Sequence, residues 1–108
     1  MKTLYIMATP IGNMEDMSAS LIKSLERCEV VFCESISSAQ RIYQSLGIKL
    51  PRLVRYWNKN ESDVLQKLEG MSESYVGLIS DAGTPAISDP GYTLVNFFHE
   101  KGWVVTSI

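Results

Sequence analysis

Apolar residues occur along the chain in short runs of strand length, and the stretches between these runs carry apolar positions at helical spacing. The runs are rich in Val, Ile, Leu and aromatic residues, which predicts strands. Five strands are expected, at residues 4–8, 30–34, 52–57, 75–80 and 103–108. Helices are expected at residues 18–28, 38–47, 61–70 and 90–102. Asp16 or Ser18 can cap the first helix, and Gly47 can end the second in a left-handed conformation.

The predicted strands are apolar throughout rather than alternating, which is typical of a sheet covered on both faces. Regular alternation of strands and helices makes the sheet parallel, with right-handed crossovers. We therefore predict an α/β fold: an open, mainly parallel five-stranded sheet with helices on both faces. Ligands of such sheets bind beyond the carboxyl ends of the strands, near the switch point in strand order. The candidate segments are residues 9–16, 34–38, 56–60 and 80–89.

Composition fits a single compact domain of 108 residues, because 45% of the residues are hydrophobic and only 20% are charged. No apolar stretch approaches membrane-spanning length, so we expect a soluble, cytoplasmic protein with no membrane partner. Cys28 and Cys33 have no His or second Cys pair nearby. We therefore expect two half-buried, reduced thiols, and neither a disulfide framework nor a metal site.

The segment SDAGTPAISDPGY at residues 80–92 combines two different signals. Asp89 followed by Pro90 is typical of a helix start, because Asp accepts free amides and Pro suits the first helical position. The first half, Ser80 to Pro85, has the small side chains of a loop whose backbone approaches a ligand. The other motif, TPIGN at residues 9–13, lacks dinucleotide and phosphate-loop spacing, so a plain tight turn stays open there.

Positive charge is concentrated in one segment, because no Asp or Glu occurs between Ser35 and Asn60. This segment carries +5, so the rest of the chain carries −7, given the net charge of −2. The cations are Arg41, Lys49, Arg52, Arg55 and Lys59. Tyr43, Tyr56 and Trp57 are interleaved with them. Two interpretations stay open: RNA binding by phosphate contacts and base stacking, or a solvated basic face with partly buried aromatics.

The stretches LYIMATPIGNMEDMS (4–18) and LISDAGTPAISDPGYTLV (78–95), with the Glu34 region, resemble the amino-terminal domain of the ribosomal RNA (cytidine-2′-O)-methyltransferase family. That family is part of the tetrapyrrole methylase superfamily. The resemblance implies an S-adenosylmethionine-dependent enzyme with two α/β domains, acting as a homodimer on a cytidine ribose of small-subunit ribosomal RNA. Residues 1–108 would form the first domain, a fragment that is inactive alone and lacks the second domain.

Carried over by position, the resemblance implies a set of cofactor-facing residues. These are Pro10, Ser80, Asp81, Ala82, Gly83, Thr84, Pro85 and Ile87. The chain departs from the family at residues 34–37, where Glu-Ser-Ile-Ser replaces Glu-Asp-Thr-Arg, and at residues 56–61, where Tyr-Trp-Asn-Lys-Asn-Glu replaces a His-rich run. These changes leave the acceptor open.

The catalytic residue also stays open, and Glu34 is the one acid considered as a base. A superfamily methylase acting on a tetrapyrrole or another small acceptor is a second hypothesis. A non-catalytic nucleotide-binding α/β module is a third.

Overall fold

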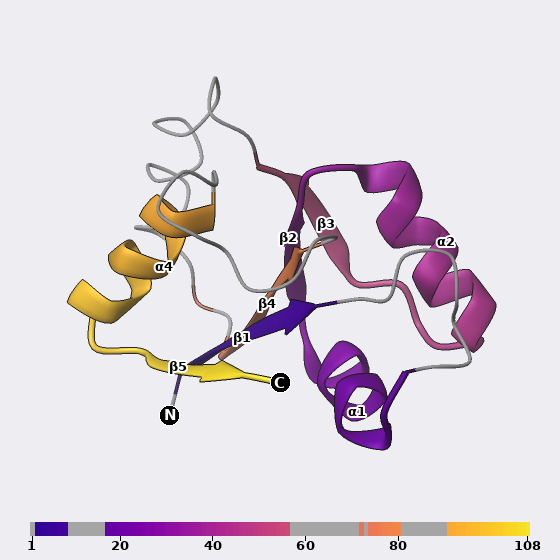
Figure 1. Ribbon diagram of the computed structural model, residues 1–108, viewed down its shortest axis with the longest axis horizontal. Coiled ribbons are helices and arrows are strands. Elements are labelled where there is room, and N and C mark those ends of the chain that lie inside the picture. Colours follow the sequence, from indigo (N-terminus) through magenta and orange to yellow (C-terminus); the bar gives the residue numbers. More distant parts are fainter. Residues whose placement is uncertain (1, 9–16, 57–71, 73, 81–90) are drawn as a thin grey trace.

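The computed structural model describes residues 2–8, 17–56, 72, 74–80 and 91–108 (Figure 1). Five strands form one sheet in the order β3-β2-β4-β1-β5, and all the pairings are parallel. The strands are β1 (Thr3–Ala8), β2 (Val30–Cys33), β3 (Arg52–Arg55), β4 (Tyr75–Ser80) and β5 (Val104–Ser107). The helices within this part of the chain are α1 (Ala19–Arg27), α2 (Ile36–Leu46) and α4 (Gly91–Glu100). The predicted fold class is confirmed; the helix predicted at 61–70 lies outside the described residues.

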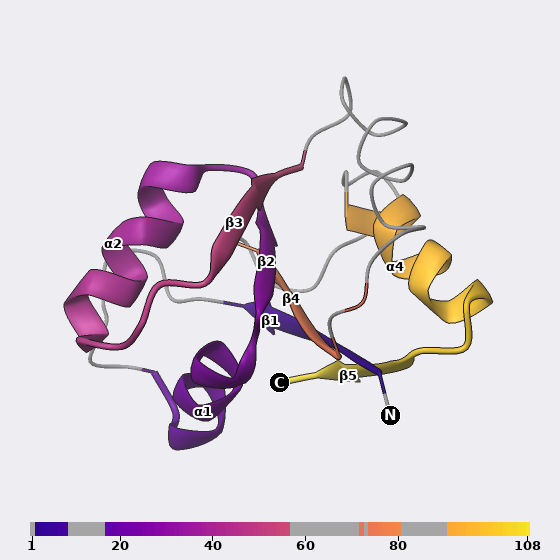
Figure 2. The ribbon, with the colours of Figure 1, turned by 180° about the vertical axis from the view of Figure 1, so that it is seen from behind.

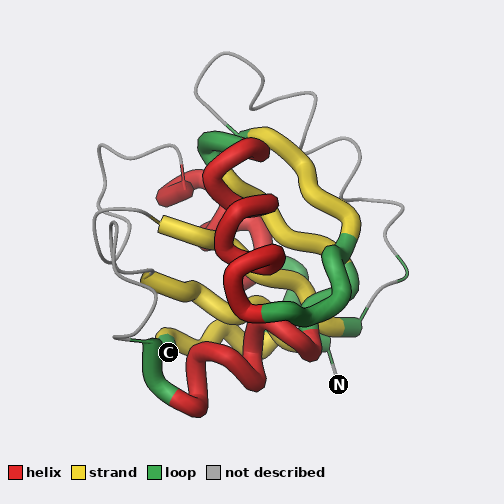
Figure 3. The backbone as a smooth tube through the Cα atoms, turned by 90° about the vertical axis from the view of Figure 1, so that its right-hand side faces the viewer, coloured by secondary structure: helices red, strands yellow, loops and turns green. Residues whose placement is uncertain are grey.

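Helices cover both faces of the sheet, α1 and α2 on one side and α4 on the other (Figures 1 and 2). Figure 3, seen from the right-hand side of Figure 1, shows α2 in front of the strands. Alternate residues of β1 to β4 contribute to two separate cores. In β1, Met7 packs toward α1 and α2, whereas Leu4 packs in the core that contains Phe98 of α4. Each such fully buried side chain stabilises the fold by roughly 1.5–3 kcal/mol.

Local signals set the ends of the helices. Ser18 caps α1, because its Oγ accepts a hydrogen bond from the Leu21 amide at 3.1 Å. Gly47 ends α2 with φ = 67°, as predicted. Helix α2 begins at Ile36, earlier than predicted, because the side chain of Ser35 accepts from the Ser38 amide at 3.3 Å and caps it. The other predicted cap, Asp16, lies outside the described residues.

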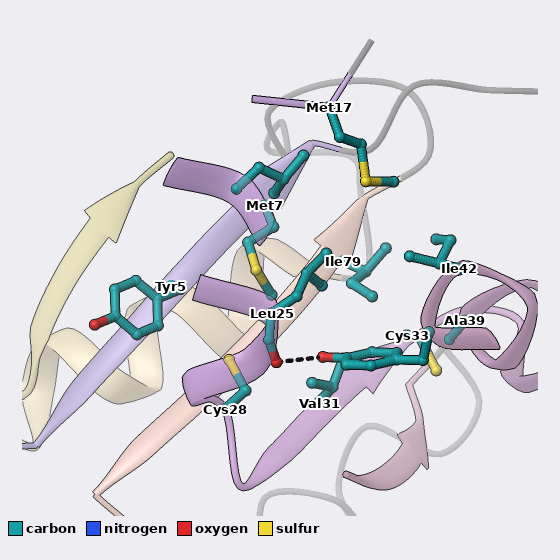
Figure 4. Packing of buried hydrophobic residues seen from close by; sticks show 12 residues of the cluster. Tyr5, Met7, Met17, Leu25, Cys28, Val31, Cys33, Ala39, Ile42 and Ile79 are labelled. Carbon is teal, nitrogen blue, oxygen red and sulfur yellow. Dashed lines mark hydrogen bonds between the residues drawn. The ribbon is translucent and has the colours of Figure 1, made fainter. Parts of the chain in front are cut away.

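Gly77, in the middle of the central strand β4, allows close packing against the α1 face. A Cβ at this position would lie 2.5 Å from Met7 Cε and 2.8 Å from Cys28 Sγ. Figure 4 shows the packing of Met7 and Cys28 with their neighbours in this core. A side chain at this position would therefore force these two sulfur-bearing side chains to move.

The two cysteines are free thiols, as predicted, but the expectation that they are half-buried is wrong. Cys28 is 5% exposed and Cys33 is 2% exposed, because both belong to the core between the sheet and helices α1 and α2. Burial, with a smaller contribution from the charge of Glu29, raises the pKa of Cys28 to about 12. The Cys28 thiol therefore stays protonated and unreactive at neutral pH.

Within the described part of the chain, no helix is long and apolar enough to cross a membrane. The same residues hold no group of three or more His, Cys, Asp or Glu side chains that could bind a metal ion.

Candidate functional site

The strand order reverses at β4, which lies between β1 and β2. The helices that follow β1 and β2, α1 and α2, lie on one face of the sheet, whereas α4, which follows β4, lies on the opposite face (Figure 1). The chain therefore leaves β4 in the opposite direction from both of its neighbours. Ligands of open α/β sheets bind at the carboxyl ends of strands related in this way.

The carboxyl ends of β1 and β4 lie side by side. Ala8 and Ser80, the last residues of the two strands, are Cα partners in the parallel ladder. Neighbouring strands lie about 4.8 Å apart, so residues 9–16 and 81–90 begin next to each other although they are far apart in the sequence. These are the two segments that carry the TPIGN and SDAGTP motifs. Of the four segments expected at this edge, these two follow the adjacent strands β1 and β4, and residues 34–38 follow β2 on the other side of β4.

Packing on both faces fixes the ends of β1 and β4. Met7 pairs with Ile79, and both are buried in the core toward α1 and α2. Leu78 is buried in the opposite core with Phe98 of α4. Ala8, by contrast, is exposed and small. A strand end that carries little side-chain bulk suits a connection whose backbone must approach a ligand.

Glu34 follows β2 at the same edge of the sheet, where the sequence placed it. Its side chain is exposed, and its backbone carbonyl accepts a hydrogen bond from Arg55 Nε at 3.2 Å. β2 pairs with β4, as in Phe32 with Leu78, on the side opposite to β1. Glu34 is thus separated from the end of β1 by the width of one strand, so it lies near the switch point without being between the two motif segments.

The structure describes only part of the predicted cofactor set. Ser80 is placed as the last residue of β4, at the switch point. The others, Pro10, Asp81, Ala82, Gly83, Thr84, Pro85 and Ile87, lie outside the described residues. Gly77, which shapes the strand leading to the site, was missed by the sequence reasoning. A lone Gly inside an apolar run is the signal that could have identified it.

In the basic segment, the described aromatic side chains are buried and the described cations are exposed. Tyr43 is fully buried and its hydroxyl donates to the Leu25 carbonyl at 2.9 Å, the hydrogen bond drawn in Figure 4. Tyr56 is only 1% exposed. The hypothesis that these two rings stack on bases is therefore wrong, because the cores of the domain already contain them. The described cations, Arg41, Lys49, Arg52 and Arg55, are all exposed; Trp57 and Lys59 lie outside the described residues.

No family model matches the chain. Among curated proteins it is similar to "Ribosomal RNA small subunit methyltransferase I" of Leptospira biflexa, with 39% identity over 92% of this chain and 42% of the relative. The protein of the same name from Micromonospora olivasterospora is 44% identical over 86% of this chain and 30% of its own length. The protein of the same name from Pseudomonas aeruginosa is 40% identical over 86% of this chain and 33% of its own length.

These matches confirm the resemblance that the two motifs indicated. The chain spans less than half the length of these curated relatives.

Proposed function

The chain is a relative of the ribosomal RNA small subunit methyltransferase I proteins, and we propose that it forms the amino-terminal domain of an S-adenosylmethionine-dependent RNA methyltransferase. The observation that carries the proposal is the pairing of Ala8 with Ser80. It brings the beginnings of the two motif segments together at the switch point, where open α/β sheets bind their ligands.

The cofactor site would be built mainly from backbone. Ser80 to Pro85 and Pro10 are the proposed binding segment, with Ile87 as an apolar wall. A small residue at the end of β1 fits this role, since Ala8 is exposed and is the ladder partner of Ser80. Carbonyl and amide groups of such loops can hydrogen-bond the polar parts of a nucleoside. The rest of the pocket would come from the second domain.

The proposed reaction depends more on the positioning of the methyl donor and acceptor than on a strong nucleophile. S-adenosylmethionine supplies a methyl group already activated by a sulfonium. In our proposal the protein aligns a ribose 2′-oxygen in line with that methyl and excludes water. The proton of the hydroxyl passes to a base or to solvent. Glu34 is the described carboxylate nearest the switch point, so it is the residue to test as that base.

The acceptor that we propose is a cytidine 2′-hydroxyl of small-subunit ribosomal RNA. The printed names of the relatives support an RNA of the small subunit as substrate. The atom and the nucleotide come from the family resemblance, and the Glu34-Ser35-Ile36-Ser37 departure makes them the part most in need of a test. We further propose that the full-length protein is cytoplasmic and acts as a homodimer.

Two measurements on the full-length protein test this function. Calorimetry with S-adenosylmethionine is expected to show binding, and the Gly83→Val variant is expected to lose it because a side chain would occupy the backbone approach. Transfer of a radiolabelled methyl group to small ribosomal subunits that lack the modification is expected to label the RNA.

Different failures point to different alternatives. Absence of S-adenosylmethionine binding, with adenine nucleotides binding instead, would favour the non-catalytic nucleotide-binding module. Binding of the cofactor without methylation of the RNA would favour a tetrapyrrole or another small acceptor.

A further inference from the structure

One edge of the sheet carries a run of exposed cations. Strand β3 is the edge strand next to β2, and α2 lies beside it (Figures 1 and 2). We call this surface the β3 edge and define it by Arg41 of α2, Lys49 of the connection, and Arg52 and Arg55 of β3. Arg52 and Arg55 begin and end the strand, so their Cα atoms lie about 10 Å apart. Their side chains leave opposite faces of this edge strand, so both ends of β3 and both of its faces carry an exposed cation.

Three of these four cations have no carboxylate partner among the described residues. These three are Arg41, Lys49 and Arg52. From Ser35 to Asn60 the sequence contains neither Asp nor Glu. A cluster of like charge costs stability through self-repulsion, so it is expected where an anionic partner binds.

Three cations outside the β3 edge lie close to aromatic rings. The Arg27 guanidinium lies 5.5 Å from the ring centroid of Tyr75. Lys2 Nζ lies 5.4 Å from the ring of Trp103, and Lys101 Nζ lies 5.5 Å from that of Phe97. The β3-edge cations Arg41, Lys49 and Arg52 have no such ring contact among the described residues.

The chemistry of the β3 edge fits phosphate rather than bases. Its two described aromatic neighbours, Tyr43 and Tyr56, are buried at 0% and 1% exposure. Within the described residues the surface thus offers charge and hydrogen-bond donors, and its aromatic rings are turned inward. Arg and Lys contact phosphate oxygens without reading sequence.

We propose that the β3 edge binds the sugar–phosphate backbone of the RNA substrate. Arg55 links this surface to the site, because its Nε donates to the Glu34 carbonyl at the carboxyl edge. The end of β3 lies two strand spacings, about 10 Å, from the end of β4. RNA held along the β3 edge can therefore extend to the switch point. This inference rests on the proposed function and adds to it the surface that provides affinity without base specificity.

The test compares two charge-removed variants of the full-length protein. The first carries Arg41→Gln, Lys49→Gln and Arg52→Gln. The matched control carries Lys2→Gln, Lys23→Gln and Lys101→Gln, which removes the same charge from other elements. RNA binding is measured by fluorescence anisotropy from low to high KCl with labelled small-subunit RNA. Methylation kinetics, S-adenosylmethionine calorimetry and thermal melting are measured on the same proteins.

For the β3-edge variant, the slope of log K against log salt is expected to fall in magnitude by about two to three. At 0.1 M salt its RNA affinity should fall on the order of 100-fold, with KM for RNA rising in parallel. Cofactor affinity, kcat and melting temperature should match the unaltered protein. The control variant should change the slope much less.

Equal changes in the two variants would overturn the inference, because a general charge effect would then explain the binding. An unchanged slope in the β3-edge variant would also overturn the inference, but the proposed methyltransferase function would stand. If the unaltered protein neither binds nor methylates the RNA, the proposed function fails together with this surface.

Discussion

The amino ends of the parallel strands meet at one edge of the sheet and the carboxyl ends at the opposite edge, and the described residues at these two edges differ. At the amino edge, polar groups bind one another: the Glu29 carboxylate accepts from the amides of Ser74 and Tyr75 at 3.0 and 3.2 Å. Arg27 there donates to the Tyr5 hydroxyl at 3.2 Å. At the carboxyl edge, the paired ends of β1 and β4 lead into the motif segments, and Glu34 is exposed.

The difference shows how a parallel sheet separates stability from function. All amino ends of the strands meet at one edge and all carboxyl ends meet at the other. The amino edge satisfies its first amides with side chains of the same domain, as Glu29 does for β4. The segments that carry the proposed cofactor-binding motifs leave from the carboxyl edge. A substitution there is expected to alter binding without disturbing the hydrogen bonds of the amino edge.

Disruption of β4, which connects both edges, should have the largest effect. We expect Gly77→Val to destabilise the chain by about 3 kcal/mol or more, because its side chain would overlap Met7 and Cys28. Urea denaturation measures the loss. Gly77→Ala should cost about 1–3 kcal/mol, and adding Met7→Ala should give a less than additive loss, since it removes one clashing group. A Gly77→Val variant with unaltered stability would contradict the close packing of β4.

High pH should weaken the packing where α1 meets the amino edge. Burial raises the pKa of Cys28 to about 12, whereas an unfolded thiol has a pKa of about 8.5. Above that value the unfolded state loses its proton first, so stability falls between about pH 9 and pH 12. The slope from this group approaches 1.4 kcal/mol per pH unit.

Urea denaturation of the chain between pH 7 and pH 11 measures this dependence. Cys28→Ala is less stable at neutral pH but should lose part of the alkaline slope. Some slope should remain, because burial also raises the pKa of Tyr43. Equal slopes for the two proteins would contradict the assignment to Cys28.

Matched substitutions of one glutamate at each edge should have the smallest effects on stability and sharpen the comparison. Glu29→Ala removes the acceptor of the Ser74 and Tyr75 amides at the start of β4, so we expect a loss of about 1 kcal/mol. Glu34→Gln at the carboxyl edge should change stability by less than about 0.5 kcal/mol. In the full-length protein, the effects on methylation should have the opposite order to the effects on stability. We expect kcat to be unchanged in Glu29→Ala and to fall by about 100-fold in Glu34→Gln if Glu34 is the base.

Unaltered kcat in Glu34→Gln would remove Glu34 as the base. A change in cofactor affinity caused by Glu29→Ala would contradict the separation of the two edges.

Much of the local structure was accessible from the sequence. The apolar runs became strands within one or two residues of their predicted ends, as in Arg52–Arg55 for residues 52–57. The early start of α2 was missed because Ser35 and Ser38 are both plausible caps, and only the hydrogen bond from the Ser38 amide decides between them.

The sequence by itself determined the α/β class, because alternation of apolar runs and helical spacing is a local property of neighbouring residues. Only the tertiary structure decided that β4 lies between β1 and β2, and hence that Ala8 meets Ser80. It also decided that Tyr43 and Tyr56 belong to the cores while the cations beside them in sequence face outward. Strand order and burial depend on contacts between residues far apart in the chain, which local periodicity does not record.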